Sequence, residues 1–237
     1  MVAQAPVQAF MEPGELFRGQ PKIMVKQEFA MLECFGCEAK NRYRVTVPNG
    51  EDEGPEVFLY INEESGCCER LCCSVNRSLT LNVHQGDNKE GKTVLSMHKP
   101  FHCQGGCFCR PTMQVFDGEK DSTLVGHIED PCRCCMMDQQ IYDETGKLIF
   151  TTYGSICQLG MCCPMCASVD FEIKQDDKKV GLISKRPMTC GECLGKTNRF
   201  IIEFPMEKKA NERKMIFAAA MLADLEYFEQ KKNKNDS

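Results

Sequence analysis

The sequence predicts a mainly β protein in which a closed antiparallel barrel encloses an apolar α-helix near the C-terminus. Two observations support this fold class. Short β-branched and aromatic segments recur from residue 45 to residue 204 and are separated by Gly, Asp, Asn and Lys. One helix-forming segment follows them, and its middle is apolar on every side. Strands that wrap such a helix bury all of its faces at once.

Composition fits one larger all-β domain, since the chain has 237 residues and 42% hydrophobic residues. The formal net charge of −5 argues against a nucleic-acid partner. We expect residues 1–21 to form a loosely ordered arm, residues 22–230 the folded domain and residues 231–237 a charged tail. The N-terminal residues lack the pattern of a secretory signal, and no segment reaches the ~20 apolar residues of a spanning helix.

Eleven segments have the length and residue pattern of strands. They are Val45–Val47, Val57–Ile61, Leu79–Val83, Val94–His98, Met113–Asp117, Leu124–Ile128, Gln139–Tyr142, Lys147–Thr152, Val169–Ile173, Val180–Ser184 and Phe200–Phe204. Several consecutive pairs flank a polar turn, which is typical of antiparallel hairpins. Hairpins in series leave two exposed edges unless the sheet closes, so a barrel is favoured over a sandwich.

One of the turns, Gly86–Thr93, formally matches a phosphate-binding loop. Such a loop must open a helix, whereas Val94–Met97 has the pattern of a strand and Pro100 follows it. Asp87 and Glu90 would also repel phosphate. We therefore interpret this segment as a hairpin turn.

The helix-forming segment is Met215–Ala223, which continues into Asp224–Gln230. Its nine residues span only ~14 Å at the rise of an α-helix, against ~30 Å for the core of a bilayer. Asp224 and Glu226 would each cost several kcal/mol in hydrocarbon. We therefore expect this helix to fill the barrel rather than to enter a membrane.

Eighteen cysteines are an unusual number for a chain without an export signal. Reduced thiols can bind a metal, carry fatty acyl chains or act as small buried apolar side chains. A two-residue spacing lets both thiolates reach one ion in three pairs, Cys34 with Cys37, Cys163 with Cys166, and Cys190 with Cys193, and the last two pairs are the metal candidates. Eighteen cysteines produce such pairs by chance, so acylated or buried thiols are the favoured interpretation and zinc is not expected.

Five segments of residues 22–230 are distinctive: the paired cysteines of Cys67–Cys73, the cysteine cluster and strand of Cys162–Ile173, Gly181–Lys185, Phe200–Pro205 and the helix end Tyr227–Glu229. Together and in this order they resemble the phospholipid scramblases, a family of the tubby-like superfamily, which carries the first segment on a hairpin. The resemblance implies a barrel of twelve strands around the C-terminal helix.

The resemblance implies a membrane-associated protein on the cytoplasmic face of a membrane that moves phospholipids between leaflets in both directions, or binds them, without covalent chemistry. The four histidines also lack a nucleophile or paired metal ligand at a catalytic spacing. The alternative function is a structural subunit that keeps the fold, binds protein partners in a larger assembly and has lost transport.

The resemblance implies, first, a site of fatty acylation. The cysteine run that is palmitoylated in related proteins corresponds to Cys103, Cys107 and Cys109. Two palmitoyl chains give stable membrane anchoring where one is marginal. Three cysteines would therefore suffice if they are acylated.

Calcium is the second ligand that the resemblance implies. The family's calcium segment corresponds to residues 196–207, where Asn198, Glu203 and Glu207 are the remaining oxygen donors. Lys196 and Arg199 lie among them and oppose a divalent cation. We therefore do not expect calcium control to be retained.

A basic run precedes and opens the helix, with Lys208, Lys209, Arg213 and Lys214 as candidates for binding a phosphoinositide headgroup. The alternative interpretation is a solvated turn. Positive charge opposes the dipole at a helix N-terminus, so we expect Glu212 to act as the capping charge, together with Glu207.

Overall fold

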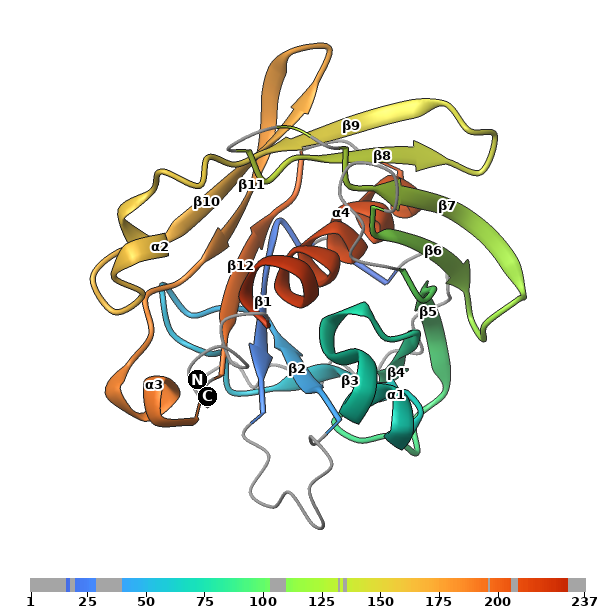
Figure 1. Ribbon diagram of the computed structural model, residues 1–237, viewed down its shortest axis with the longest axis horizontal. Coiled ribbons are helices and arrows are strands. Elements are labelled where there is room, and N and C mark those ends of the chain that lie inside the picture. The colour runs from blue at the N-terminus through green and yellow to red at the C-terminus, as the bar shows by residue number, and fades with distance from the viewer. Residues whose placement is uncertain are drawn as a thin grey trace, which may run out of the picture.

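The computed structural model describes residues 16–17, 20–28, 40–102, 110–131, 133, 136–195, 197–205 and 209–229. Twelve strands wrap around one long helix (Figure 1). The strands are β1 (Lys22–Gln27), β2 (Arg42–Thr46), β3 (Val57–Glu64), β4 (Leu79–Gln85), β5 (Thr93–Lys99), β6 (Thr112–Asp117), β7 (Thr123–Glu129), β8 (Gln139–Asp143), β9 (Leu148–Tyr153), β10 (Val169–Gln175), β11 (Lys178–Lys185) and β12 (Arg199–Glu203).

The helices are α1 (Cys67–Cys73), η2 (Ser74–Asn76), α2 (Leu159–Cys162), α3 (Cys190–Gly195), α4 (Ala210–Ala223) and the π-helical turn η4 (Asp224–Phe228). The segment Cys67–Cys73 was expected on a hairpin and instead forms α1, with Gly66 as its N-cap. The helix lies within the connection between the paired strands β3 and β4, which residues 65–78 make too long for a tight turn.

Every strand pairs antiparallel with its neighbour in sequence, and β1 closes the sheet by pairing with β12. Val25 lies opposite Phe200 in this closing pair, and Ile23 lies opposite Ile202. Closure satisfies the backbone groups that an open sheet would leave at its edges. The predicted closed antiparallel barrel is confirmed, and β1 is the strand that the eleven predicted segments lacked.

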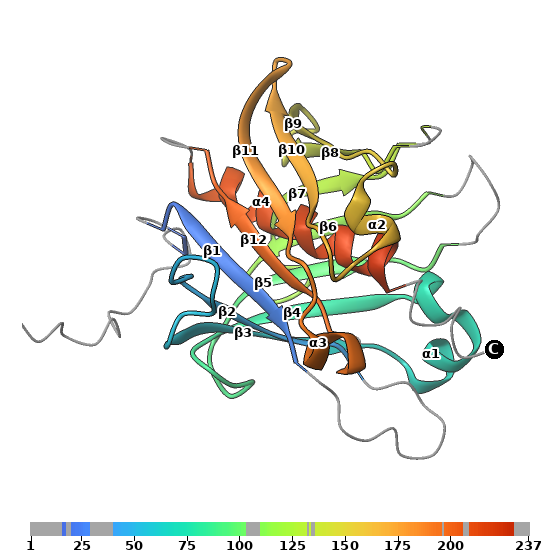
Figure 2. The same cartoon turned by 90° about the vertical axis from the view of Figure 1, so that its left-hand side faces the viewer.

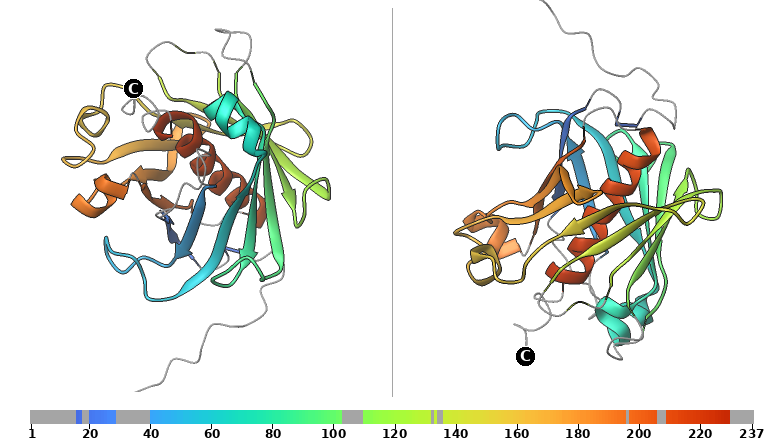
Figure 3. Two further views of the ribbon diagram at one scale, coloured as in Figure 1. Left: turned by 60° about the horizontal axis from the view of Figure 1, so that its bottom comes forward. Right: turned by 90° about the horizontal axis from the view of Figure 1, so that it is seen from above.

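Helix α4 is the core of the barrel, and Figure 3 shows it inside the ring of strands. Each residue of Met215–Ala223 is at most 1% exposed. The barrel wall approaches closely at Gly126, where a Cβ atom would lie 3.1 Å from the sulfur of Met215 and 2.2 Å from the carbonyl oxygen of Tyr142. The prediction of a helix-filled barrel is confirmed. Within the described ranges, no helix has both the length and the apolar character needed to cross a bilayer.

Because the strands alternate in direction, their connections alternate between two ends of the barrel. The turn end carries the connections that are mostly shorter, residues 47–56, 86–92, 118–122, 144–147, 176–177 and 204–209. The loop end carries the long connections, residues 28–41, 65–78, 100–111, 130–138, 154–168 and 186–198. The segment that matched a phosphate loop joins β4 to β5 at the turn end, with Gly86 at a φ of +99°, which confirms the hairpin interpretation.

Two residues of the expected N-terminal arm belong to the core. Leu16 and Phe17 are each 1% exposed, and the ring of Phe17 lies 5.2 Å from that of Phe204 and 5.1 Å from that of Phe217. The guanidinium of Arg213 donates to the carbonyl oxygen of Phe17. The expectation of a loosely ordered arm is therefore wrong for these two residues, which cover α4 at the turn end.

Candidate functional site

A buried polar cluster surrounds the last turns of the central helix at the loop end. Its acidic members Asp224, Glu226 and Glu229 are 2%, 6% and 9% exposed. Removal of a carboxylate from water is unfavourable unless a hydrogen bond or an opposite charge compensates it. The cluster is built from strands and connections that supply such partners.

Arg77 is the central cation of this cluster. Its Nε lies 2.9 Å from Oε1 of Glu63, and its Nη2 lies 2.8 Å from Oε1 of Glu229. Burial alone would lower the pKa of Arg77, but the charges of Glu229 and Glu63 raise it above its usual range. Burial acts to raise the pKa of Glu63, yet the hydrogen bonds and charge of Arg77 outweigh it, so the net shift is downward. Both groups are therefore ionised, and they tie β3 and the β3–β4 connection to the end of the helix.

Asp224 begins the π-helical turn and is held by neutral donors. It accepts hydrogen bonds from Nδ2 of Asn198 at 2.6 Å and from the hydroxyl of Tyr43 at 2.8 Å. Burial raises the pKa of Tyr43 well above its usual range, and the charge of Asp224 raises it further. The hydroxyl is therefore a permanent donor to this carboxylate.

Glu226 pairs with the buried Lys99 at 3.3 Å. The ammonium of Lys99 also donates to the carbonyl oxygen of Val75 at 2.7 Å. Burial raises the pKa of Glu226 to about 7, against the opposing effect of Lys99. Burial lowers the pKa of Lys99. Nearby His102 has its pKa lowered to about 4 by burial and by the charge of Lys99. Glu226 is thus a buried carboxyl group that changes charge near neutral pH.

The residues expected to bind calcium do not converge. Asn198 precedes β12 and Glu203 is its last residue, so at the rise of a strand they lie about 16 Å apart. Asn198 is 3% exposed and engaged with Asp224, whereas Glu203 pairs with Lys22 at 2.7 Å. These two residues cannot ligate one ion, because a strand replaces the loop that a calcium site needs. Glu207 lies outside the described residues.

The basic run does not form one surface patch. Lys214 is 0% exposed and pairs with Asp117 at 2.9 Å, and Arg213 donates to the carbonyl oxygens of Phe17 and Gln20. The expected patch is therefore wrong for these two side chains, since the barrel encloses the first turns of α4. Lys209 is exposed at the N-cap of α4, and its backbone N–H donates to Oε2 of Glu212 at 3.2 Å, which confirms Glu212 as the capping residue. Lys208 lies outside the described residues.

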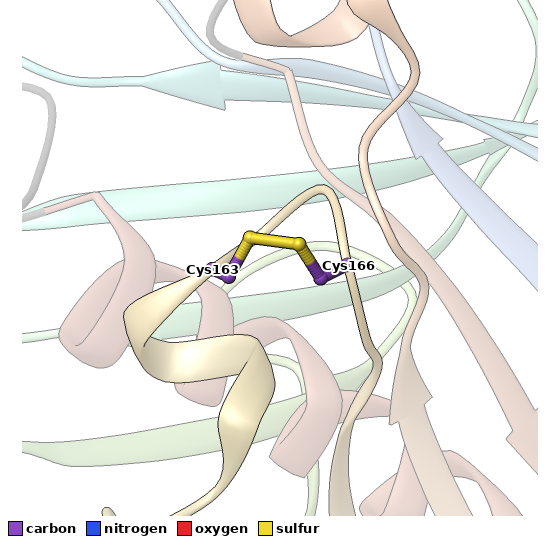
Figure 4. Close-up of a disulfide and its surroundings, with 2 residues drawn as sticks. All are labelled: Cys163 and Cys166. Carbon is purple, nitrogen blue, oxygen red and sulfur yellow. A yellow bond between two sulfur atoms is a disulfide. The ribbon is translucent and has the colours of Figure 1, made fainter.

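The cysteines named as metal candidates lie in two connections at the loop end. Cys163 and Cys166 form a disulfide in the β9–β10 connection (Figure 4), so neither sulfur is a free thiolate ligand. Cys190 and Cys193 are free and exposed on α3. No group of three or more His, Cys, Asp or Glu within the described part of the chain is placed to hold a metal ion. The acylation candidates Cys103, Cys107 and Cys109 lie outside the described residues.

Two open grooves lie on the outer side of the first strands, with volumes of about 410 and 640 Å³. Glu28 and Arg44 line both grooves and pair at 2.5 Å. The β2–β3 connection folds back over the smaller groove, where Glu53 pairs with Lys26 at 2.8 Å. Opposite charges neutralise each other within these grooves, so neither forms a strongly basic or acidic site.

The fold and the cluster define a class of protein: a closed twelve-stranded barrel with its own C-terminal helix as core and buried charges that lock the helix in place. The sequence model of the Scramblase family matches residues 3–230. The chain therefore belongs to the Scramblase family, and the barrel agrees with the tubby-like architecture expected from the sequence.

Curated relatives agree with this family. The chain is 26% identical to phospholipid scramblase 1 of Rattus norvegicus over 216 residues, which cover 90% of this chain and 61% of the relative. It is 26% identical to phospholipid scramblase 2 of Bos taurus, covering 88% of this chain and 68% of the relative. It is 27% identical to phospholipid scramblase 1 of Homo sapiens, covering 88% and 63%. The chain thus spans about three-fifths to two-thirds of the length of these relatives. No solved structure matches it.

Proposed function

We propose that this protein moves phospholipids between the two leaflets of a membrane in both directions, without covalent chemistry. The observation that carries this proposal is the match of the Scramblase family across residues 3–230, together with relatives named phospholipid scramblases. The match covers 61% of the rat relative and 63% of the human relative, so the activity of the whole relative is transferred here as a proposal.

We further propose that the protein acts at the cytoplasmic face of a membrane. Palmitoyl chains on Cys103, Cys107 and Cys109 would supply anchoring, since two or more chains hold a protein stably on a bilayer. Release of the protein from a membrane fraction by hydroxylamine would establish thioester-linked chains. Retention in the membrane fraction after hydroxylamine would argue against anchoring by these cysteines.

The filled interior of the barrel leaves no route for a phospholipid through it. Residues Met215–Ala223 fill the interior at no more than 1% exposure, and Arg77 and Lys99 hold the end of the helix through ion pairs. A phospholipid headgroup has no room to pass through a core packed at this density. We therefore place the lipid path outside the barrel, at its contact with the bilayer.

Calcium is not needed in this proposal. Asn198 and Glu203 are held apart by β12, and Asn198 is already bonded to Asp224. Lipid movement should therefore proceed at the same rate with calcium and with a calcium chelator. The same design tests the alternative function of a scaffold subunit, which would give no lipid movement in either condition.

The test is a proteoliposome assay with a fluorescently labelled phospholipid in both leaflets and dithionite as the external quencher. In protein-free vesicles about half of the label is protected, so bidirectional movement appears as quenching beyond that half. The matched arms are calcium, chelator, heat-denatured protein and no protein. We expect faster loss of the protected fraction with folded protein alone, equally with and without calcium. A protected fraction that persists in every arm would overturn the transport proposal.

A further inference from the structure

The barrel topology gathers the cysteines of the described residues at one end. Every one of the 18 cysteines belongs to one of the six connections of the loop end, although they are dispersed along the sequence. Ten of them lie in the described part of the chain, on α1, α2, α3 and the β9–β10 connection. Figure 2 shows α1 and α2 beside the end at which α4 finishes. None of the described strands, and no turn-end connection, contains a cysteine.

The three most exposed large apolar side chains of the described residues also lie at this end, whereas Val47, Leu124 and Leu148 are exposed at the turn end. Five large apolar residues on loop-end connections are exposed: Phe101, Ile156, Leu159, Met165 and Leu194. Leu194 on α3 is 86% exposed and Leu159 on α2 is 65% exposed. Single exposed apolar residues are ordinary on soluble surfaces, but Leu194 and Leu159, the two most exposed, lie on connections that neighbour each other around the barrel, as expected of an interaction surface.

The two ends of the barrel also differ in the charge of their connections. The turn-end connections contain twelve acidic and six basic residues, whereas the loop-end connections contain seven of each. The β9–β10 connection, residues 154–168, contains no charged residue at all. A leaflet of anionic lipids would repel the turn end, whose connections have an excess of acidic residues. It would not repel the loop end, where acidic and basic residues are equal in number.

We propose that the loop end is the face by which the barrel docks on a phospholipid bilayer, with Leu194 and Leu159 entering the interface. This inference rests on the proposed function, because it names the surface through which a lipid-moving protein meets its substrate. Docking at this end places seven free thiols, those of Cys68, Cys72, Cys73, Cys157, Cys162, Cys190 and Cys193, at the lipid interface. Thioester acyl chains on them would extend into the bilayer and strengthen the contact.

The first experiment measures vesicle binding by the full chain produced in bacteria, which add no palmitate. Binding to sedimented vesicles of phosphatidylcholine and phosphatidylserine is compared for the wild type, for Leu194→Glu with Leu159→Glu, and for the control Leu124→Glu with Leu148→Glu. The control pair is exposed at the turn end. Loss of two inserted leucines should weaken binding about tenfold or more, while the control binds like the wild type. Equal binding of both variants would overturn the proposal.

The second experiment uses the absence of tryptophan from the chain, so that one introduced tryptophan is the only such reporter. Leu194→Trp fluorescence should be quenched by brominated phospholipid in the vesicles, and Leu148→Trp fluorescence should not. Quenching of Leu148→Trp alone would reverse the docking end and overturn the proposal. A change of oligomeric state in Leu194→Glu, with vesicle binding unchanged, would assign the surface to a second copy of the chain.

These readouts separate the inference from the proposed function, because neither measures lipid movement. Leucine-dependent binding without any lipid movement would remove the transport function and leave the docking face. Lipid movement by the wild type, together with vesicle binding that is unaffected by the Leu194→Glu and Leu159→Glu changes, would leave the function and remove the docking face.

Discussion

Arg77 and Glu229 are separated by 152 positions in the sequence, yet their side chains meet at 2.8 Å inside the barrel. Arg77 precedes β4, and Glu229 follows η4 at the end of the central helix. The ion pair therefore joins the wall of the barrel to its core. Arg77 is 1% exposed and also pairs with Glu63, so this one cation neutralises two buried carboxylates.

Replacement of Arg77 by methionine should destabilise the fold strongly. It would leave Glu63 and Glu229 buried without their cation, and loss of one partner of a buried pair costs about 3–5 kcal/mol. The matched control is Lys22→Met, which removes the exposed pair with Glu203 and should cost no more than about 1 kcal/mol. Urea unfolding of both variants measures the difference. Equal destabilisation by the two changes would show that the Arg77 cluster does not hold the helix.

Glu226 should make stability depend on pH near neutrality. Its pKa is about 7 in the folded protein and 4.5 ordinarily, so the folded state binds this proton more tightly than the unfolded chain. Its contribution is therefore fully present below about pH 4.5 and is lost as the pH rises through 7. At 1.36 kcal/mol for each pKa unit, the loss is about 3 kcal/mol.

Glu226→Gln removes this titration. The unfolding free energy of the wild type minus that of the variant should fall by about 3 kcal/mol between about pH 4.5 and pH 8. His102 titrates in the same region but is present in both proteins, so its contribution largely cancels in the difference. Urea unfolding at several pH values measures it. A difference that does not change with pH would mean that Glu226 has an ordinary pKa.

Gly126 tests the close contact between the barrel wall and α4. In Gly126→Ala the added methyl group would meet the carbonyl oxygen of Tyr142 and the sulfur of Met215, so we expect a loss of about 1–3 kcal/mol. Gly191→Ala is the control, because a Cβ there has no neighbour within 4 Å. Thermal or urea unfolding of both variants measures the effect. Similar stability of the two would place α4 farther from β7 than described.

Much of the fold is predictable from the sequence because its signals are local. The segment Val169–Ile173 alternates between buried and partly buried positions, and Met215–Ala223 is apolar all around, so periodicity identifies both. The strand β1 is harder to recognise. Its residues Ile23, Met24 and Val25 are buried in succession, so it lacks the alternation of a half-buried strand, and Glu53 of the β2–β3 connection pairs with Lys26 beside them.

The candidate site is less predictable because it depends on distant pairing. Asp224 and Glu226 signal that the helix ends outside hydrocarbon, but the sequence does not show that Asn198 and Tyr43 hold Asp224 or that Lys99 pairs with Glu226. Three acidic residues closing an apolar helix are the signal that could have prompted a search for buried cations. The gathering of cysteines at the loop end likewise follows only from the order of the strands.

The central structural claim is that α4 remains the core of the barrel when the protein is on a membrane. Phe217 is 0% exposed within α4 and contacts Phe17 near the turn end, away from the proposed docking face. The measurement is the fluorescence of Phe217→Trp, the only tryptophan of the variant, on vesicles that contain brominated phospholipid. We predict that binding to these vesicles leaves its emission unquenched, while Leu194→Trp is quenched in the same preparation. Strong quenching of Phe217→Trp would show that the helix leaves the barrel and enters the bilayer, which would contradict the closed core described above.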